Sequence, residues 1–229
     1  MPLNIGQYSN IKSSDINNLG MSIKSIVTEG MITHCDSANN ASYDGSGTTW
    51  TDLTGNGFNG TLQNGLGREN TYGSFDFNGV NHFVSFNFGS ATTSEVTVEL
   101  WCKRTDTSGA EYFWDARNDG GTWMLCEYNG YDWNWGNGTF YNDNNLYTSW
   151  HQYVATSDSS GSRLYRNGLV KATGGSNNAR LGNSFHLGTR YTQSSWWLGQ
   201  MAIFRVYDRV LNENEVQQNF LASKDRFGI

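Results

Sequence analysis

Seven Asn-Gly pairs constrain the fold of this chain more than any other feature of its sequence. They begin at Asn56, Asn59, Asn64, Asn78, Asn129, Asn137 and Asn167. This dipeptide readily supplies the positive φ angles that tight turns between antiparallel strands require. The sequence therefore predicts a chain of short antiparallel strands joined by hairpin turns.

Segments with the period of a β-strand lie between these pairs. Apolar and polar residues alternate in stretches that begin at Ser74, His82, Glu95, Trp123, His151, Ser162, Ser184 and Met201. Many short strands separated by turns are typical of a β-sandwich or a barrel, and 229 residues fit one large β domain or two small ones. Because Trp50, Trp101 and Trp150 are large enough to bridge two sheets, we expect them in the core.

The two ends of the chain differ from its middle. The segment "LNENEVQQNFLASK" predicts a helix over residues 212–224, with Asn212 as its N-cap and Glu215 completing a capping box. We expect this helix to cover one edge or end of the sheets. Residues 1–30 contain no Trp and lack hairpin signals, so they are interpreted as an N-terminal arm that docks on the domain, on a sister subunit or on a larger assembly. Residues 31–229 then form the domain.

Charge and hydropathy exclude several classes of partner. Charged residues make up 16% of the chain and the net charge is -6, which argues against nucleic-acid binding. No apolar run is long enough for a membrane span, and the N-terminus lacks the pattern of a signal peptide, so we expect synthesis in a cytoplasm without membrane insertion. Three cysteines, Cys35, Cys102 and Cys126, are an odd number at unpatterned spacing, which predicts small buried side chains rather than disulfides or metal ligands.

One stretch, "YNGYDWNWGNGTFYNDNN" at residues 128–145, has the composition of a sugar-binding surface. Its period is two, so Tyr131, Trp133 and Trp135 fall on one face of a strand, with Asn134 on the other. If the rings point inward, they close the sandwich. If they point outward, they form a stacking surface for sugar rings, with Asn and Asp side chains supplying hydrogen bonds, and these four residues are the candidate glycan-binding set.

From about Ile32 onward the chain resembles a known family. The motifs that carry the resemblance are "CDSANNASYDGSGTTWTDLTGNGFNGTL", "SFDFNGVNHFVSF", "VTVELWCKR", "SWHQYVAT", "RLYRNGLV" and a closing segment that ends in "RFGI". Their order is similar to that of concanavalin A-like, laminin G-type domains found in bacteriophage virion proteins. The resemblance implies an all-β fold, a two-sheet antiparallel jelly-roll sandwich.

The same resemblance implies a function. It predicts a non-enzymatic structural protein of a phage virion, either a capsid decoration, a head-fibre subunit or a tail-associated subunit, displayed on the virion surface. Its expected partners are the major capsid protein or other virion proteins, further copies of itself in a homo-oligomer, and a host-surface polysaccharide. A free or cell-surface carbohydrate-binding module is the alternative.

Three departures from the family pattern concern metal binding. Asn81-His82, Asn167-Gly168 and Met201-Ala202 stand where family members often carry carboxylates, which weakens an inherited calcium site. Asp52 and Asn56 still offer oxygen ligands for Ca²⁺. The alternative is an Asx turn, in which these two side chains bond to the local backbone. No other cofactor is expected.

A glycoside hydrolase is the third hypothesis, and the segment "EVTVE" is its candidate catalytic strand. Glu95 and Glu99 resemble the outer members of the Glu-x-Asp-x-Glu strand of laminarinase-like enzymes, but Thr97 replaces the central Asp. We therefore interpret the two Glu residues as the solvent face of a sheet whose core face carries Val96, Val98 and Leu100. The side chains of a Ser-His-Asp triad need only meet in space, so the sequence leaves that arrangement open.

Overall fold

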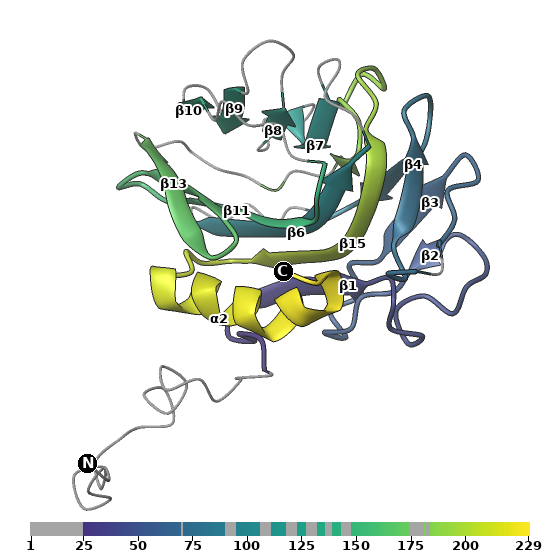
Figure 1. The fold of residues 1–229 in the computed structure, drawn as a ribbon, viewed down its shortest axis with the longest axis horizontal. Coiled ribbons are helices and arrows are strands. Elements are labelled where there is room, and N and C mark those ends of the chain that lie inside the picture. The colour runs from purple at the N-terminus through teal and green to yellow at the C-terminus, as the bar shows by residue number, and fades with distance from the viewer. Residues whose placement is uncertain are drawn as a thin grey trace, which may run out of the picture.

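The computed structural model confirms a two-sheet antiparallel sandwich (Figure 1). It describes residues 25–69, 71–89, 95–105, 111–117, 123–126, 132–135, 139–142, 148–174, 181 and 184–229. For the strands at 123–126, 132–135 and 139–142 it describes the backbone alone. Every alternating segment named above contains a strand, because a period of two places one face of each segment in a core.

The first sheet has seven strands, all paired antiparallel. Their order is β1-β15-β6-β11-β12-β13, and β4 pairs with the first half of β15. The bounds are β1 (Met31–Asp36), β4 (Phe75–Asn78), β6 (Val96–Arg104), β11 (His151–Ser157), β12 (Ser162–Arg166), β13 (Leu169–Gly174) and β15 (Leu198–Tyr207).

The second sheet has eight strands, in the order β10-β9-β8-β7-β14-β5-β3-β2. The bounds are β2 (Thr49–Trp50), β3 (Gly60–Gln63), β5 (Phe83–Phe86), β7 (Glu111–Asp115), β8 (Trp123–Cys126), β9 (Asp132–Trp135), β10 (Thr139–Asn142) and β14 (Phe185–Leu187). The sequence did not predict β7, because all five of its residues are buried and their hydropathy does not alternate.

The main core lies between the two sheets. Val98 and Leu100 enter it from the seven-stranded sheet, and Val84, Phe86 and Phe185 enter it from the eight-stranded sheet. Trp50 is fully buried in this cluster, as predicted. Cys35 and Cys102 are buried here too, which confirms the interpretation of these two cysteines.

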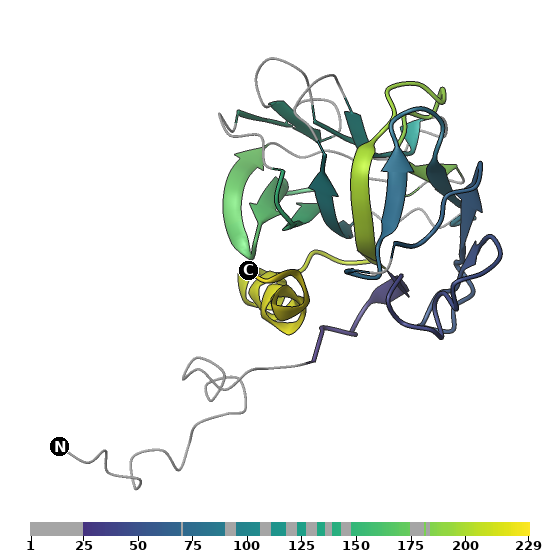
Figure 2. The same cartoon turned by 45° about the vertical axis from the view of Figure 1, so that its right-hand side comes forward.

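A helix covers the other face of the seven-stranded sheet (Figures 1 and 2). It is α2 (Glu213–Ser223), capped by Asn212 and Glu215 in the predicted capping box, and η3 (Lys224–Phe227) follows it. Trp101 and Trp150 pack here against Phe227. Both are buried, as predicted, but in a second cluster beneath the helix and not between the two sheets. No helix in the described ranges is both long and apolar enough to span a membrane.

The helix also covers Glu99. The sequence interpretation placed this residue on a solvent face, which is wrong. Its side chain is fully buried beneath α2. It accepts hydrogen bonds from Arg205 Nη1 at 2.7 Å, Asn219 Nδ2 at 2.7 Å, Gln152 Nε2 at 3.0 Å and Trp101 Nε1 at 3.2 Å. A buried carboxylate is tolerated when its charge is paired and its lone pairs are occupied.

Residues 25–30, the described part of the predicted arm, lie against the same layer. Val27 N donates to Asn219 Oδ1 at 2.8 Å, and Tyr207 Oη donates to Val27 O at 3.1 Å. Because Val27 is itself buried among residues of α2 and the sheet, this part of the segment packs as part of the domain. Residues 1–24 lie outside the described ranges.

Candidate functional site on the outer face of the eight-stranded sheet

A row of polar side chains crosses the outer face of the eight-stranded sheet. Strand register places Thr61 opposite Ser85, Ser85 opposite His186, and His186 opposite Asp115. Directly paired residues of neighbouring strands share a face of the sheet. Their sequence neighbours, such as Val84 and Phe185, enter the core, so this row faces away from it.

The row lines a pocket of about 340 Å³. Thr61 of β3, Ser85 of β5 and His186 of β14 line it. The remaining lining residues are Gly57, Asn59, Phe86, Asn87 and Ser184. Hydroxyl, amide and imidazole groups dominate this set. Ser85 Oγ also accepts a hydrogen bond from Gln63 Nε2 at 3.0 Å, which fixes the position of the hydroxyl within the pocket.

His186 supplies a polar atom that needs a partner. Burial lowers the pKa of its imidazole below the usual value, so the ring is neutral at neutral pH. A neutral imidazole carries one donor and one acceptor nitrogen. Its buried Nδ1 atom has no hydrogen-bond partner among the described residues, and a buried polar atom without a partner is unusual in a folded protein.

Aromatic rings border this row on the same face. Phe83 lies with its ring centroid 5.1 Å from that of His186 and 6.0 Å from that of Trp196. At the other end of the row, the Arg117 guanidinium lies over Tyr112 at 5.2 Å and over Tyr191 at 5.5 Å. Trp196 and Tyr191 are partly exposed, so their rings are accessible to a ligand.

The loop that carries these two rings is held in an uncommon conformation. Gln193 and Ser195 have φ angles of 54° and 56°, a region that residues with a side chain rarely occupy. Hydrogen bonds from Arg190 N to Ser194 O and from Gln193 N to Arg190 O tie the loop together. Backbone strain of this kind is concentrated at functional sites.

Ser85, His186 and Asp115 have the residue types of a hydrolytic triad, but their hydrogen bonds differ from those of one. Asp115 is fully buried and binds Arg117, with Oδ2 2.6 Å from Nη2 and 3.1 Å from Nε. No hydrogen bond joins Asp115 to His186 Nδ1, so the three side chains do not form the continuous hydrogen-bonded chain of a triad.

The predicted glycan-binding strand belongs to the same sheet. It is β9, which lies between β8 and β10, and its register pairs Trp133 with Cys126 and Tyr141. The side chains of Trp133, Asn134 and Trp135 lie outside the described atoms and Tyr131 outside the described residues, so their role stays a prediction. The sequence did not identify Ser85, His186 or Trp196, because their proximity depends on strand order.

Asp52 and Asn56, the predicted calcium ligands, both bond to neighbouring backbone. Asp52 Oδ1 accepts from His34 N at 2.9 Å and from Thr54 N at 3.0 Å. Asn56 Nδ2 donates to Ile32 O at 3.0 Å, so its amide nitrogen is used for loop structure. The described residues contain no group of three or more His, Cys, Asp or Glu side chains that could hold a metal ion.

These features define a class of protein: a two-sheet jelly-roll sandwich with a polar and aromatic outer face. The chain belongs to the Concanavalin A-like lectin/glucanases superfamily, whose sequence profile matches residues 77–217, more than half of the chain. A comparison with curated proteins gives no match.

Solved structures share this fold at low sequence identity. Domain 4 of an extracellular arabinanase from Geobacillus stearothermophilus, in complex with arabinotriose, is 20% identical with a TM-score of 0.65, over 84% of this chain and 98% of that one. Trypanosoma rangeli sialidase in complex with sialic acid is 16% identical with a TM-score of 0.69, over 88% of this chain and 34% of that one. The binding domain of botulinum neurotoxin DC in complex with SialylT is 11% identical with a TM-score of 0.63, over 85% of this chain and 51% of that one.

Proposed function

We propose that this chain is a non-enzymatic carbohydrate-binding module whose ligand lies on the outer face of the eight-stranded sheet. One observation carries the proposal: a polar pocket lined by Thr61, Ser85 and His186, bordered by the rings of Phe83 and Trp196. A sugar ring presents apolar C–H faces and hydroxyls that both donate and accept. Aromatic rings beside hydroxyl and imidazole groups complement both.

The complexes named above support this choice of ligand class. Those proteins were solved in complex with arabinotriose, sialic acid and SialylT, respectively. The similarity concerns the fold alone.

The proposal of a non-enzymatic role rests on the carboxylates. Glu99 is buried in an ion pair with Arg205 beneath α2, whereas Glu95 is exposed immediately before the same strand. Retaining glycosidases need two carboxyl groups about 5 to 5.5 Å apart beside the substrate. A carboxylate enclosed beneath α2 is not available for that task.

The sequence resemblance further supports a place on the surface of a phage virion, as a decoration, head-fibre or tail-associated subunit. Residues 25–30 dock on the α2 side of the seven-stranded sheet (Figure 1). The candidate ligand site lies on the outer face of the other sheet. Attachment through the preceding residues to the capsid protein, to other virion proteins or to further copies of this chain would leave the ligand site exposed to a host polysaccharide.

Glycan binding is tested with the full chain on a glycan array, with and without a chelator. Trp196→Ala and His186→Gln should each weaken the signal at least about tenfold, because each removes a contact worth more than about 1.4 kcal/mol. Leu169→Ala, at an exposed position on β13, is the matched control and should bind normally. A Trp133→Ala/Trp135→Ala pair tests β9 separately. Absence of any glycan signal from the folded wild-type protein would refute the proposal.

The virion role is tested by the copy number of this chain in purified particles. Removing residues 1–24 should leave a folded domain that no longer incorporates, whereas a longer deletion would also remove the buried Val27 contact. Normal incorporation of the shortened chain would contradict anchoring by these residues, and absence of the full chain from particles would contradict the virion role.

A further inference from the structure

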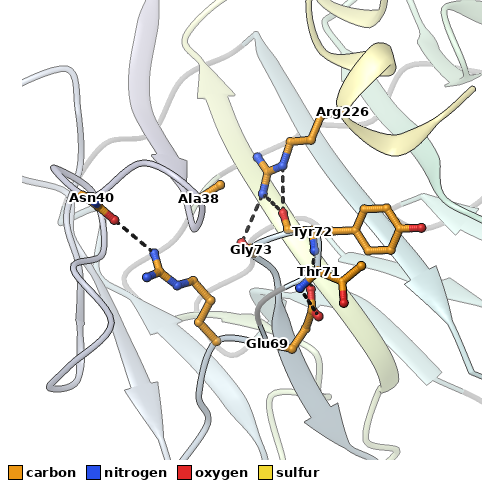
Figure 3. A pocket seen from close by; sticks show the side chains of 8 residues that line it. Ala38, Asn40, Glu69, Thr71, Tyr72, Gly73 and Arg226 are labelled. Atoms are coloured by element: carbon orange, nitrogen blue, oxygen red, sulfur yellow. Dashed lines mark hydrogen bonds between the residues drawn. The ribbon is translucent and has the colours of Figure 1, made fainter.

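A second pocket, of about 400 Å³, lies beside η3 (Figure 3). It shares no lining residue with the outer-face pocket. The loop after β1, the loop before β4 and η3 supply its lining: Ala38, Asn40, Arg68, Glu69, Thr71, Tyr72, Gly73 and Arg226. Two guanidinium groups and one carboxylate therefore border a single polar cavity.

Two of these three charged groups, Arg226 and Glu69, form hydrogen bonds that hold the loops in place. Arg226 Nη1 lies 2.6 Å from Asp36 Oδ1, and its Nε and Nη2 atoms donate to Tyr72 O at 2.9 and 2.6 Å. Glu69 accepts from Thr71 N at 2.7 Å and from Tyr72 N at 2.8 Å (Figure 3). Burial alone would raise the pKa of Glu69, but these backbone hydrogen bonds outweigh it and lower the pKa, so the group is ionised at neutral pH.

Arg68 differs from both. Its Nη1 atom donates to Ser37 O at 3.0 Å, to Tyr43 O at 2.9 Å and, at 3.5 Å, to Asn40 Oδ1. Its guanidinium lies 5.6 Å from the centre of the Tyr43 ring. No carboxylate among the described residues comes within ion-pair distance of it. Its Nε and Nη2 atoms donate no hydrogen bond within the same ranges. The result is a fixed, partly buried cation with one donor edge unused.

Small residues surround this arginine and the cavity floor. A Cβ atom at Gly45 would lie 3.2 Å from Arg68 Nη2, and one at Gly73 would lie 2.8 Å from the Cβ atom of Ala38. Both glycines have positive φ angles, 101° at Gly45 and 60° at Gly73, which glycine adopts without strain. A side chain at Gly45 would therefore crowd the Nη2 side of Arg68, and one at Gly73 would crowd Ala38.

We infer that this pocket binds the carboxylate of an acidic sugar through the Nε and Nη2 edge of Arg68. A planar carboxylate matches this edge with two parallel hydrogen bonds. A single negative charge suits the site better than a phosphate dianion, because ionised Glu69 borders the same cavity. Asn40 and Thr71 then face the sugar hydroxyls. The choice of a sugar as carrier of the carboxylate rests on the proposed carbohydrate-binding function, but the site itself rests on Arg68.

The test compares matched ligands on the full-length wild-type protein. D-galacturonate, D-galactose and inorganic phosphate are titrated separately, and the ¹⁵N resonance of Arg68 Nε is followed by NMR. Saturable shifts with galacturonate, and at least about tenfold weaker binding of galactose, are expected. Equal responses to galacturonate and galactose would overturn the inference, and so would stronger binding of phosphate than of galacturonate.

Variants separate this site from the outer face. Arg68→Lys keeps the charge but loses the two-pronged edge, so it should weaken galacturonate binding at least about tenfold. Arg163→Lys, at an exposed position on β12, is the matched control. Because Arg68 also holds the loop that contains Ser37 and Tyr43, Asn40→Ala serves as a second variant that keeps the arginine and should weaken binding severalfold. Trp196→Ala should leave the galacturonate-induced shift of the Arg68 Nε resonance unchanged. Loss of that shift in Trp196→Ala would refute the assignment. Galacturonate binding that is not weakened in Arg68→Lys and Asn40→Ala would refute it too.

Discussion

Replacing Glu99 by Gln should destabilise the protein strongly, although the change alters one atom. Glu99 is fully buried and accepts four hydrogen bonds, one of them from Arg205 at 2.7 Å. The amide would remove the negative charge and place N–H donors against donor groups of Asn219, Gln152 or Trp101. Removing one partner of a buried ion pair costs about 3 to 5 kcal/mol, because the other charge stays buried and uncompensated.

This cost is measurable by thermal or urea unfolding. In a domain of this size each 1 kcal/mol lowers the unfolding midpoint by about 2 to 4 °C, so a drop of roughly 6 to 20 °C is expected for Glu99→Gln. Glu95→Gln is the matched control on the same segment. Because Glu95 is exposed, its substitution should change the free energy of unfolding by less than about 0.5 kcal/mol.

A second substitution tests the mechanism. Adding Arg205→Met to Glu99→Gln removes the uncompensated cation and should recover part of the lost stability. Amide exchange at Val27 offers a local measurement, since its N–H bonds to Asn219, which in turn bonds to Glu99. If Glu99→Gln matches Glu95→Gln in stability, or if Arg205→Met only adds to the loss, the reasoning about the buried network is refuted.

Two further predictions concern a histidine and a glycine. Burial and the charge of Arg205 lower the pKa of His34 from 6.5 to about 4; between these values the unfolded chain binds a proton that the folded chain does not, so stability should fall by roughly 3 kcal/mol as the pH falls. Urea unfolding at pH 7 and pH 4 measures this, and an unchanged pH dependence in His34→Gln would contradict it. Gly60→Ala would place a methyl group 2.7 Å from Phe86 and 2.8 Å from Val84, costing about 1 to 3 kcal/mol. Gly67→Ala, which meets no atom closer than 4.0 Å, should unfold near the wild-type midpoint.

Local sequence patterns predicted most of the strands and the helix. Alternation with a period of two located β4, β5 and β6, and the Asn212 to Glu215 capping box located the start of α2. These signals act between residues close in sequence, through strand pleating and through the unpaired N–H groups of a helix end. They do not depend on which strand lies beside which.

The failures share one cause. The sequence shows that Val98 and Glu99 point to opposite faces of a strand, but not that a helix more than a hundred residues later covers the second face. That helix turns a solvent position into a buried ion pair at Glu99 and places Trp101 and Trp150 outside the main core. Long-range packing decided each of these outcomes.

The candidate ligand sites show the same division. By itself the sequence determined the period of each strand, the turns between strands, the helix cap and the membership of an all-β lectin-like family. The tertiary structure alone decided that Ser85, His186 and Asp115 form one row, and that Arg68 and Arg226 border one pocket. Strand order and loop packing bring these residues together from distant positions, and the contacts that fix such neighbours are absent from any local stretch of the chain.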